Sequence, residues 1–341
     1  MIVACDKTNF RQIKDDNEYV YIFDNEPLKD LLETKLHCIR YDKVRYVDIN
    51  TTRFDIRCKK KAKITDDFTL KKRDYKIAIV IPNRNYAEFL DKCFTSILNQ
   101  TYKNYEVIFV DDVSTDNSVK VAKSYKEKFD KVCKGMKIIQ LQQRRLNGGS
   151  RNVAYLYVDE NTDYIYYIDA DDWFYDENAL KKINEALIGE PDVLFVSIAK
   201  CKNGITTREK TPQYKDRYEA MKGWSGSCGK VIKKLLAIRQ ECLYNEGTLQ
   251  EDRNQHRKIC IYMNDFKCLE DLIYVWNQDN YKSTTTIRDK ATWKTSAIRN
   301  YADTIQLALS VKGQDEKIDK ILEESIRKCK EEVQTGGDKQ Y

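Results

Sequence analysis

The sequence predicts an α/β fold in which a mostly parallel β-sheet is flanked by helices. Short apolar runs rich in Val, Ile and Tyr alternate with amphipathic segments of helical period between residues 76 and 188. This alternation is typical of parallel strands joined by crossover helices. Polar side chains follow each apolar run directly, at the point where the strands of such a sheet end at a binding site. The 341 residues suffice for one such domain with further segments at its ends.

The first predicted strand is Lys76–Ile81, a run of sequence KIAIVI that Pro82 ends. A continuous β-branched run is typical of a parallel strand buried on both faces. Asn85 can cap the helix that follows. Its apolar residues recur at helical spacing, so that one stripe packs on the sheet; they are Phe89, Leu90, Cys93, Phe94, Ile97 and Leu98.

The same alternation continues through three more strands and three more helices. The strands are expected at Glu106–Val110, Lys137–Leu141 and Tyr164–Ile168. A helix containing Val119 to Phe129 follows the first of them, and two more helices are expected at Ser150–Val158 and Glu177–Ile188. This order is that of a Rossmann-like half with a parallel sheet.

Segments of different pattern flank this core. Residues 1–74 are expected to form a small N-terminal α/β extension, with strands in Glu18–Asp24 and Val44–Arg57. The main domain is expected over 75–290, divided into halves at 75–176 and 177–290. Its later strands are expected at Asp192–Ala199 and at either Cys260–Ile261 or Leu272–Trp276. Residues 291–341 are expected to be a C-terminal helical segment and tail, with the helical pattern over Ala302–Val333 and a break near Gly313.

Composition excludes several classes of protein. No run approaches the roughly 18–20 apolar residues of a membrane span, and the N-terminus lacks the pattern of a signal peptide. The 11 cysteines are scattered without a CxxC pair, which favours reduced thiols and a cytoplasmic location. Lys and Arg number 60 against 54 Asp and Glu, so the charge permits anionic partners without requiring nucleic acid.

The polar residues after the predicted strands should meet at one edge of the sheet. Clustered carboxylates repel one another unless a cation or a hydrogen-bonded ligand compensates. A metal diphosphate supplies both. The four groups are Pro82 to Asn85, Asp111 with Asp112, Arg144 to Gly149, and Asp169 to Asp172.

The stretch Lys76–Asp176 resembles the nucleotide-binding half of an inverting glycosyltransferase of family 2, with the GT-A fold. The resemblance is carried by KIAIVIPNRNYAEFLDKCFTSILNQTYKNYEVIFVDDVSTDNS, NGGSRN and YIYYIDADDW, with weaker matches to about Arg288. It implies transfer of a hexose from a nucleotide sugar, of which a UDP-sugar fits best, to a hydroxyl acceptor. It also implies Mn²⁺ or Mg²⁺, hard ions that suit carboxylate ligands.

The resemblance implies roles for the residues on the donor side. Asp169 and Asp171 form the DxD motif, in which Asp171 is the direct metal ligand and Asp169 faces the ribose or a metal-bound water. Of the pair Asp111 and Asp112, the second accepts a hydrogen bond from the nucleobase, unless both only cap the next helix and its turn. The backbone before them is also implied in the donor site, where Pro82 and Asn83 contact base and ribose and Arg84 has an open role.

The resemblance further implies a diphosphate contact and a general base. Arg151 is expected to contact the donor or its diphosphate; the alternative is a salt bridge to the loop of Asp169–Asp172. The base that deprotonates the acceptor is assigned to Asp252, with Glu251 second. The alternative is that this acidic pair simply opens a helix over Arg253–Ile259, which the helix dipole favours.

Three further side chains are weaker candidates. His256 lies four residues after Asp252, so a helix would place both on one face, and His256 could be a third metal ligand or bind phosphate. A histidine of the core or surface is the alternative. Lys230 and Lys233 could meet phosphate, with solvated lysines as the alternative.

Other functions compete with this interpretation. A hydrolase also uses paired carboxylates but needs no nucleobase site. A nucleotidyltransferase would show a glycine-rich loop where this chain has PNRNY, and a non-catalytic sugar-binding module would not depend on the carboxylates. The acceptor stays open between a glycan, a glycolipid, a protein and hydroxymethylated DNA, for which the basic stretch Lys59–Arg73 gives slight support.

Overall fold

A computed structural model describes the backbone of residues 2–5, 19–22, 45–48, 55–58, 74–281 and 290–334, with side chains over 74–281 and 291–334. The chain divides into two compact units, Met1–Lys71 and Lys72–Tyr341. In the first unit, β1 (Ile2–Cys5) pairs in parallel with β2 (Tyr19–Ile22), and β3 (Arg45–Asp48) pairs antiparallel with β4 (Asp55–Cys58). The basic stretch Lys59–Arg73 lies outside the described residues.

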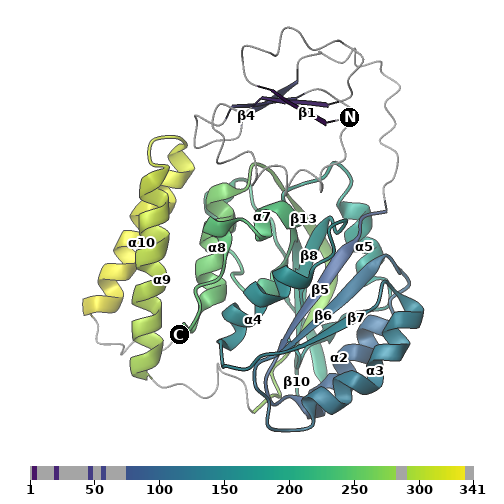
Figure 1. Cartoon of the computed structure of the whole chain (residues 1–341). Helices are drawn as coiled ribbons and strands as arrows, with labels where there is room; N and C mark the ends of the chain where they lie inside the picture. The colour runs from purple at the N-terminus through teal and green to yellow at the C-terminus, as the bar shows by residue number, and fades with distance from the viewer. Residues whose placement is uncertain are drawn as a thin grey trace. The chain divides into compact units, whose positions relative to one another are not determined.

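The second unit is built on one nine-stranded sheet with the order β7-β6-β5-β8-β12-β10-β13-β9, to which β11 adds beside β10. The first four strands in this order are parallel to one another, and β10 is parallel to β13. The sheet is therefore mostly parallel, as the sequence predicts (Figure 1). Its strands are β5 (Ile77–Asn83), β6 (Tyr105–Asp111), β7 (Met136–Gln140), β8 (Tyr164–Tyr167), β9 (Trp173–Phe174), β10 (Val193–Lys202), β11 (Ile205–Lys210), β12 (Lys230–Lys233) and β13 (Phe266–Asn277).

Helices cover both faces of the sheet. Their bounds are α2 (Ala87–Leu98), α3 (Ser118–Val132), α4 (Leu146–Ala154), α5 (Ala179–Ala186), α6 (Arg217–Lys222), α7 (Lys234–Ala237), α8 (Glu251–Tyr262), α9 (Lys290–Ser310) and α10 (Glu316–Gln334). No helix in the described ranges combines the length and the apolar character that crossing a membrane requires.

The central strands are buried on both faces, which explains their unbroken apolar runs. Successive residues of β5 alternate between two cores because side chains of a strand point to opposite faces. Ile77, Ile79 and Ile81 pack with α2, α3 and α5. Ala78 and Val80 pack on the other face with α7, α8 and α10.

Most predicted elements are found, with differences at their ends. The helix expected at Ser150–Val158 begins earlier, at Leu146, so that Gly148 and Gly149 lie inside its first turns. Residues 260–261 belong to α8, and β13 contains the alternative strand 272–276. Asn85 does not cap α2; it has φ +59°, and its Oδ1 accepts from the Thr115 amide. The division of 75–290 into two halves stays a prediction.

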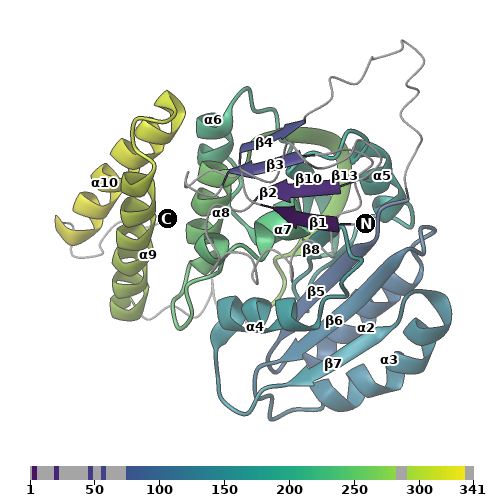
Figure 2. The same cartoon turned by 45° about the horizontal axis from the view of Figure 1, so that its top comes forward.

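The C-terminal helices pack on the main unit. Figure 1 and Figure 2 both show α9 alongside α8, with α10 packed on α9. The chain turns between α9 and α10 at Gly313, whose φ of +78° is the conformation that favours glycine. The predicted break is therefore confirmed, although the helical region begins earlier than expected, at residue 290.

Candidate active site

The first two strands of the site end side by side. Asn83 and Asp111 are partners in the register of β5 and β6, and both are buried. Nδ2 of Asn83 donates to Oδ1 of Asp111 at 2.9 Å, and the Asp112 amide donates to the Asn83 carbonyl at 2.8 Å. Parallel pairing thus brings these polar groups together at the carboxyl edge of the sheet, as the sequence predicts.

The buried carboxylate of Asp112 holds the start of α4. Its Oδ1 accepts from the amide of Arg145 at 2.7 Å and its Oδ2 accepts from the amide of Leu146 at 2.9 Å. These N–H groups have no partner within the helix. The expected alternative for this acidic pair was capping of the next helix; Asp112 instead caps α4, and Asp111 accepts from the Ser114 amide in the turn before α3. The nucleobase contact stays a prediction.

The strand ends also place Pro82 and Arg84. Pro82 lies inside β5, paired in register with Val110, and is buried. Arg84 is half-buried, and its Nε has no hydrogen-bond partner among the described residues. The structure therefore leaves the guanidinium of Arg84 with unused donor capacity next to the site.

The DxD carboxylates lie after β8 in different surroundings. Oδ1 of Asp169 accepts from Nη2 of Arg151 at 2.7 Å. Oδ2 of Asp171 accepts from Nδ2 of Asn280 at 2.6 Å. Burial, reinforced by the charge of Asp169, raises the pKa of the Asp171 carboxyl to about 6, although the Asn280 hydrogen bond opposes this shift. Two carboxylates are thus held close together at a real electrostatic cost.

The next carboxylate, Asp172, anchors the DxD loop to β13. Its Oδ1 accepts from the Asn277 amide at 2.7 Å, and its Oδ2 accepts a short hydrogen bond from the Tyr274 hydroxyl. The sequence pattern gives Tyr274, Asn277 and Asn280 no functional role. The signal that could have found the two asparagines is the polar sequence WNQDN, in which they directly follow the apolar strand.

Arg151 joins the DxD loop to the acidic pair of α8. Its side chain is 2% exposed, Nη2 contacts Asp169, and Nη1 donates to Oε1 of Glu251 at 2.8 Å. The ring of Tyr244 lies against the guanidinium, 5.3 Å from its central carbon. The expected alternative, a salt bridge to the DxD loop, is present. The direct diphosphate contact stays a prediction.

Glu251 and Asp252 open α8, and they differ in burial. Glu251 is buried, and this burial raises the pKa of its carboxyl to about 7, with Arg151 opposing the shift and Asp252 adding to it. Asp252 is half-buried, and its Oδ1 accepts from the Arg253 amide at 2.8 Å. Glu251 is therefore held in an ion pair with Arg151. In Asp252, by contrast, Oδ2 can face an acceptor.

His256 does not lie with the DxD carboxylates. Its ring is buried against Phe195, and its Nε2 makes a hydrogen bond of 2.9 Å with the Ala220 carbonyl. Burial and the charge of Lys230 lower the pKa of this imidazole well below its usual value. In the parts of the chain that are described, no group of three or more His, Cys, Asp and Glu could hold a metal. These contacts favour the core histidine over the metal ligand.

Neither Lys230 nor Lys233 is a solvated surface lysine. Lys230 is fully buried, and its Nζ donates to the carbonyls of Ser225 and Gly226 at 2.9 and 2.8 Å. Nζ of Lys233 donates to the Glu190 carbonyl at 3.2 Å. Lys230 is therefore not an exposed lysine, and its contacts give no support to a phosphate ligand. Its ammonium instead holds the loop of Trp224–Gly229 through these two carbonyls.

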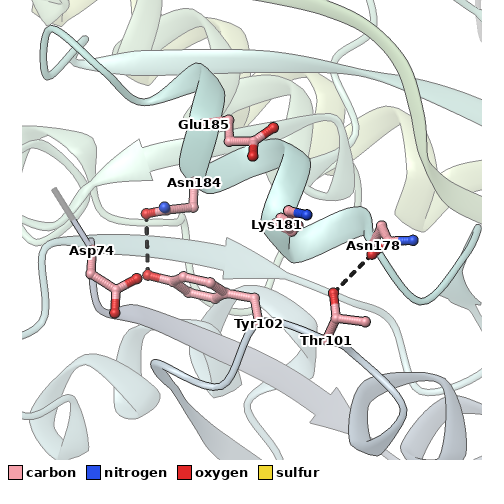
Figure 3. A pocket seen from close by; sticks show the side chains of 7 residues that line it. All are labelled: Asp74, Thr101, Tyr102, Asn178, Lys181, Asn184 and Glu185. Atoms are coloured by element: carbon pink, nitrogen blue, oxygen red, sulfur yellow. Dashed lines mark hydrogen bonds between the residues drawn. The ribbon is translucent and has the colours of Figure 1, made fainter. Parts of the chain in front are cut away.

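A polar pocket of about 420 Å³ lies at the opposite, amino-terminal edge of the sheet (Figure 3). Its polar groups bond to one another: Tyr102 donates to Asn184, and Thr101 donates to Asn178. This pocket shares no residue with the carboxylate groups of the site, and its paired side chains give no sign of a ligand. The remaining lining residues are Asp74, Lys181 and Glu185.

The DxD residues fit a hard divalent ion. Among the described residues, Arg151 is the donor to Asp169 and engages Oδ1, while Asn280 engages Oδ2 of Asp171. One oxygen of each carboxylate is left for a cation, which would also offset the repulsion that raises the pKa of Asp171. Oxygen donors of this kind suit Mn²⁺ or Mg²⁺, with a bound diphosphate supplying further ligands.

The sheet order and the carboxylate groups at its edge define an α/β domain of the GT-A class. A family model described as Glycosyl transferase family 2 matches residues 78–245. The match identifies residues 78–245, just under half of the chain, as a glycosyl transferase family 2 domain. The matched region contains the strand ends of β5, β6 and β8, and it stops just before the acidic pair of α8.

Curated relatives match about a third of the chain. Glycosyltransferase GlyA of Streptococcus pneumoniae is 34% identical over 116 residues, which are 33% of this chain and 16% of that protein. Poly(ribitol-phosphate) beta-glucosyltransferase of Bacillus spizizenii is 33% identical over 124 residues, 35% of this chain and 18% of that protein. Processive diacylglycerol beta-glycosyltransferase of Mycoplasma pneumoniae is 33% identical over 117 residues. That match covers 33% of this chain and 32% of the Mycoplasma protein.

Solved structures share the fold at low sequence identity. TarS of S. aureus, residues 1–349 in complex with UDP-GlcNAc, has a TM-score of 0.59 and 18% identity, and covers 74% of this chain and 71% of its own. The mannosyltransferase PcManGT of Pyrobaculum calidifontis, in complex with GDP-Man and Mn²⁺, has a TM-score of 0.50 and 13% identity, covering 78% and 76%. These likenesses confirm the GT-A fold.

Proposed function

We propose that this chain is a metal-dependent inverting glycosyltransferase that moves a hexose from a UDP-sugar to a hydroxyl group of a glycan or glycolipid. The observation that carries the proposal is the position of Arg151 between Asp169 and Glu251. A single buried guanidinium couples the DxD loop to the acidic pair that includes the assigned base. Hydrogen bonds through Arg151 therefore join the residues proposed to bind the donor to those proposed to act on the acceptor.

The choice of donor and acceptor rests on two kinds of support. The solved neighbours bind UDP-GlcNAc in one case and GDP-Man with Mn²⁺ in another. The relatives named above act, by their names, on poly(ribitol-phosphate) and diacylglycerol. Both acceptors carry hydroxyl groups. In this chain the polar strand ends formed by Asn83, Asp111 and Asp112 would contact the nucleotide of the donor.

The transfer is a single displacement. The acceptor oxygen forms a bond to the anomeric carbon while the bond from that carbon to the diphosphate oxygen breaks. Asp252 takes the proton of the acceptor hydroxyl; a positioned base of this kind contributes about 10²–10⁴ in rate. Its partial exposure supports this role, because the buried Glu251 is already paired with Arg151.

The remaining residues bind and orient. Asp169 and Asp171 would hold the divalent ion, which neutralises negative charge on the departing nucleoside diphosphate. Arg151 fixes the direction of the Asp169 carboxylate, and Asp172 fixes the loop to β13. The peptide groups of β5 and β6 are positioned by their parallel pairing.

The test uses the whole chain and a panel of UDP-glucose, UDP-galactose and UDP-GlcNAc with Mn²⁺. Wild-type protein should release UDP slowly with water as acceptor, and UDP should raise its melting temperature, since a ligand of the folded state stabilises it by RT ln(1 + [L]/Kd). Asp171→Asn should lose Mn²⁺-dependent UDP binding. Asp252→Asn should keep UDP binding and lose transfer by about 10²–10⁴.

The control is Asp130→Asn, which changes an exposed carboxylate paired with Lys126 on α3. It should bind UDP and turn over like the wild type. Failure of every nucleotide sugar to bind or react with any divalent ion would exclude the enzyme and leave a sugar-binding module. Equal turnover of Asp252→Asn and wild type would remove the base assignment but not the donor site.

A further inference from the structure

The side-chain amide of Asn300, on α9, makes four hydrogen bonds to the segment that leads into Glu251 and Asp252. Its Nδ2 donates to the carbonyls of Leu249 at 2.8 Å and Gln250 at 3.2 Å. Its Oδ1 accepts from Nδ2 of Asn245 and from Oγ1 of Thr248, both at 3.1 Å. Asn300 is 2% exposed. An amide offers two donors and two lone pairs, so the whole capacity of this side chain is used on one segment.

The bound segment needs such support because its backbone is unusual. Gln250, the residue before Glu251, has φ +59°, a left-handed conformation that disfavours residues with a Cβ. No side chain caps the start of α8 at Gln250. Local bonds join Thr248 to the Asn245 carbonyl and Arg253 to Oε1 of Gln250, and contacts from α9 add to them in fixing the angle at which α8 leaves the segment.

Other residues of α9 hold the same turn. Oγ of Ser296 accepts from the Leu249 amide at 3.0 Å. Nδ2 of Asn254, one turn into α8, donates to the Asn300 carbonyl at 2.8 Å and to Oγ1 of Thr304 at 3.1 Å. Thus α9 binds both the segment before the acidic pair and the first turn after it.

We propose that Asn300 is a positioning residue for the general base, and that α9 is a functional part of the active site. The inference rests on the proposed function, in which Asp252 is the base. Asp252 lies two residues after Gln250, so a rotation of the segment moves its carboxylate directly. A base acts only within hydrogen-bond reach of its proton, and a displacement of about 1 Å can cost about a hundredfold in rate.

Asn300 lies outside residues 78–245, the part of the chain that the family model matches. The hydrogen-bonded partners of Asn300 lie at or just beyond that boundary, at Asn245, Thr248, Leu249 and Gln250. The core of the domain thus supplies the donor site, and a helix added after it sets the geometry on the acceptor side.

Two variants of Asn300 separate its donors from its acceptors. Asn300→Asp keeps two oxygens for Asn245 and Thr248 but loses both N–H donors to the carbonyls of Leu249 and Gln250. Asn300→Leu keeps the branched shape, in a somewhat larger side chain, and loses all four bonds. The matched control is Ser325→Ala on α10, whose equally buried hydroxyl bonds only within its own helix, to the Ile321 carbonyl.

The experiment measures UDP release from the panel of UDP-glucose, UDP-galactose and UDP-GlcNAc, and UDP binding with Mn²⁺, on the full chain. Both Asn300 variants should lower kcat about 10- to 100-fold while the Kd for UDP changes less than twofold. Ser325→Ala should keep kcat even where its melting temperature falls. A loss of melting temperature in Asn300→Asp with an unchanged kcat would overturn the inference.

A double-mutant cycle distinguishes positioning from a general loss of structure. If Asn300 acts through Asp252, Asn300→Asp should cause no further loss of kcat in an Asp252→Asn protein. Full additivity of the two losses would overturn the inference and leave the proposed function intact. A normal kcat in Asp252→Asn would instead overturn the base assignment, and with it this inference, so the two failures are distinguishable.

Discussion

A Cβ atom added at Gly148 would lie 2.8 Å from Cγ of Glu251. Gly148 is in the first turn of α4, and Glu251 is the first residue of α8. The two helices therefore approach each other closely at this point. The approach brings Glu251 to Arg151, one turn further along α4, where the two side chains form a buried ion pair.

We expect Gly148→Ala to lower both stability and turnover. The added methyl group would collide with the buried stem of Glu251, and overpacking of this kind costs about 1–3 kcal/mol. The start of α8 would move away from α4 and carry Asp252 with it, so kcat should fall about 10- to 100-fold. Urea unfolding and UDP release measure the two effects.

The control for this variant is Gly204→Asn in the turn between β10 and β11. Gly204 has φ +73° and open space around it, and Asn tolerates this conformation better than most residues. Turnover should be unchanged. A Gly148→Ala protein with wild-type stability and rate would show that α4 and α8 can separate without effect on the site.

Arg151→Met should be among the most destabilising single changes at the site. Removing one member of a buried ion pair costs about 3–5 kcal/mol, because the remaining charge is left without compensation. Here Glu251 loses its partner inside the protein, and Asp169 loses the donor that orients it. Urea unfolding measures the stability, and Mn²⁺-dependent UDP binding should weaken as well.

The matched comparison is Lys126→Met, which removes an exposed i,i+4 pair with Asp130 on α3. Exposed pairs contribute less than about 1 kcal/mol, so this variant should unfold almost like the wild type and bind UDP normally. Losses of similar size in the two variants would mean that Arg151 does not act as a buried bridge.

The pattern of residues predicts the sheet well for a physical reason. A strand buried on both faces must be apolar at every position, so runs such as that of β5 stand out in a polar sequence. The polar residues that end each run are equally local signals, which is why Asn83, Asp111 and the DxD pair could be placed at the strand ends from the sequence.

Contacts between distant segments could not be predicted in this way. Asn280 meets Asp171, and Asn300 meets Leu249, across 109 and 51 residues respectively. A single asparagine in a loop or helix has no periodic signal that names its partner. Burial of Lys230 was missed for the same reason, since a charged residue at a core position gains its partners only from tertiary structure.

Metal-free protein should be stabilised by Asp171→Asn at neutral pH. Burial and the charge of Asp169 raise the pKa of Asp171 to about 6 from its usual 3.8. Between these values the folded state binds more protons than the unfolded state, so stability falls as pH rises through this window. A shift of about two pKa units corresponds to about 3 kcal/mol of unfolding free energy. The wild type loses this stability as Asp171 ionises, whereas the uncharged Asn side chain does not.

The measurement is urea unfolding of wild type and Asp171→Asn from pH 4 to pH 7, first with a chelator and then with Mn²⁺ and UDP. With the chelator, the advantage of the variant should grow as pH rises. With Mn²⁺ and UDP the order should reverse, because only the wild type binds the ion tightly. A constant difference between the two proteins at all pH values would contradict the raised pKa.

The buried ammonium of Lys230 should give the protein a pH dependence of the opposite sign. Burial lowers the pKa of Lys230 to about 8 from its usual 10.5. Between these values the folded state binds fewer protons than the unfolded state, so stability rises as pH rises through this window. Lys230→Met loses this dependence together with the bonds to Ser225 and Gly226. The unfolding free energy of the wild type, minus that of Lys230→Met, should therefore rise by about 2–3 kcal/mol between pH 8 and 10.5.

The control is Lys123→Met, which changes an exposed lysine on α3. Its unfolding free energy should depend on pH as that of the wild type does. If the unfolding free energy of Lys230→Met also followed the wild type at every pH, this ammonium would be solvated in the folded protein.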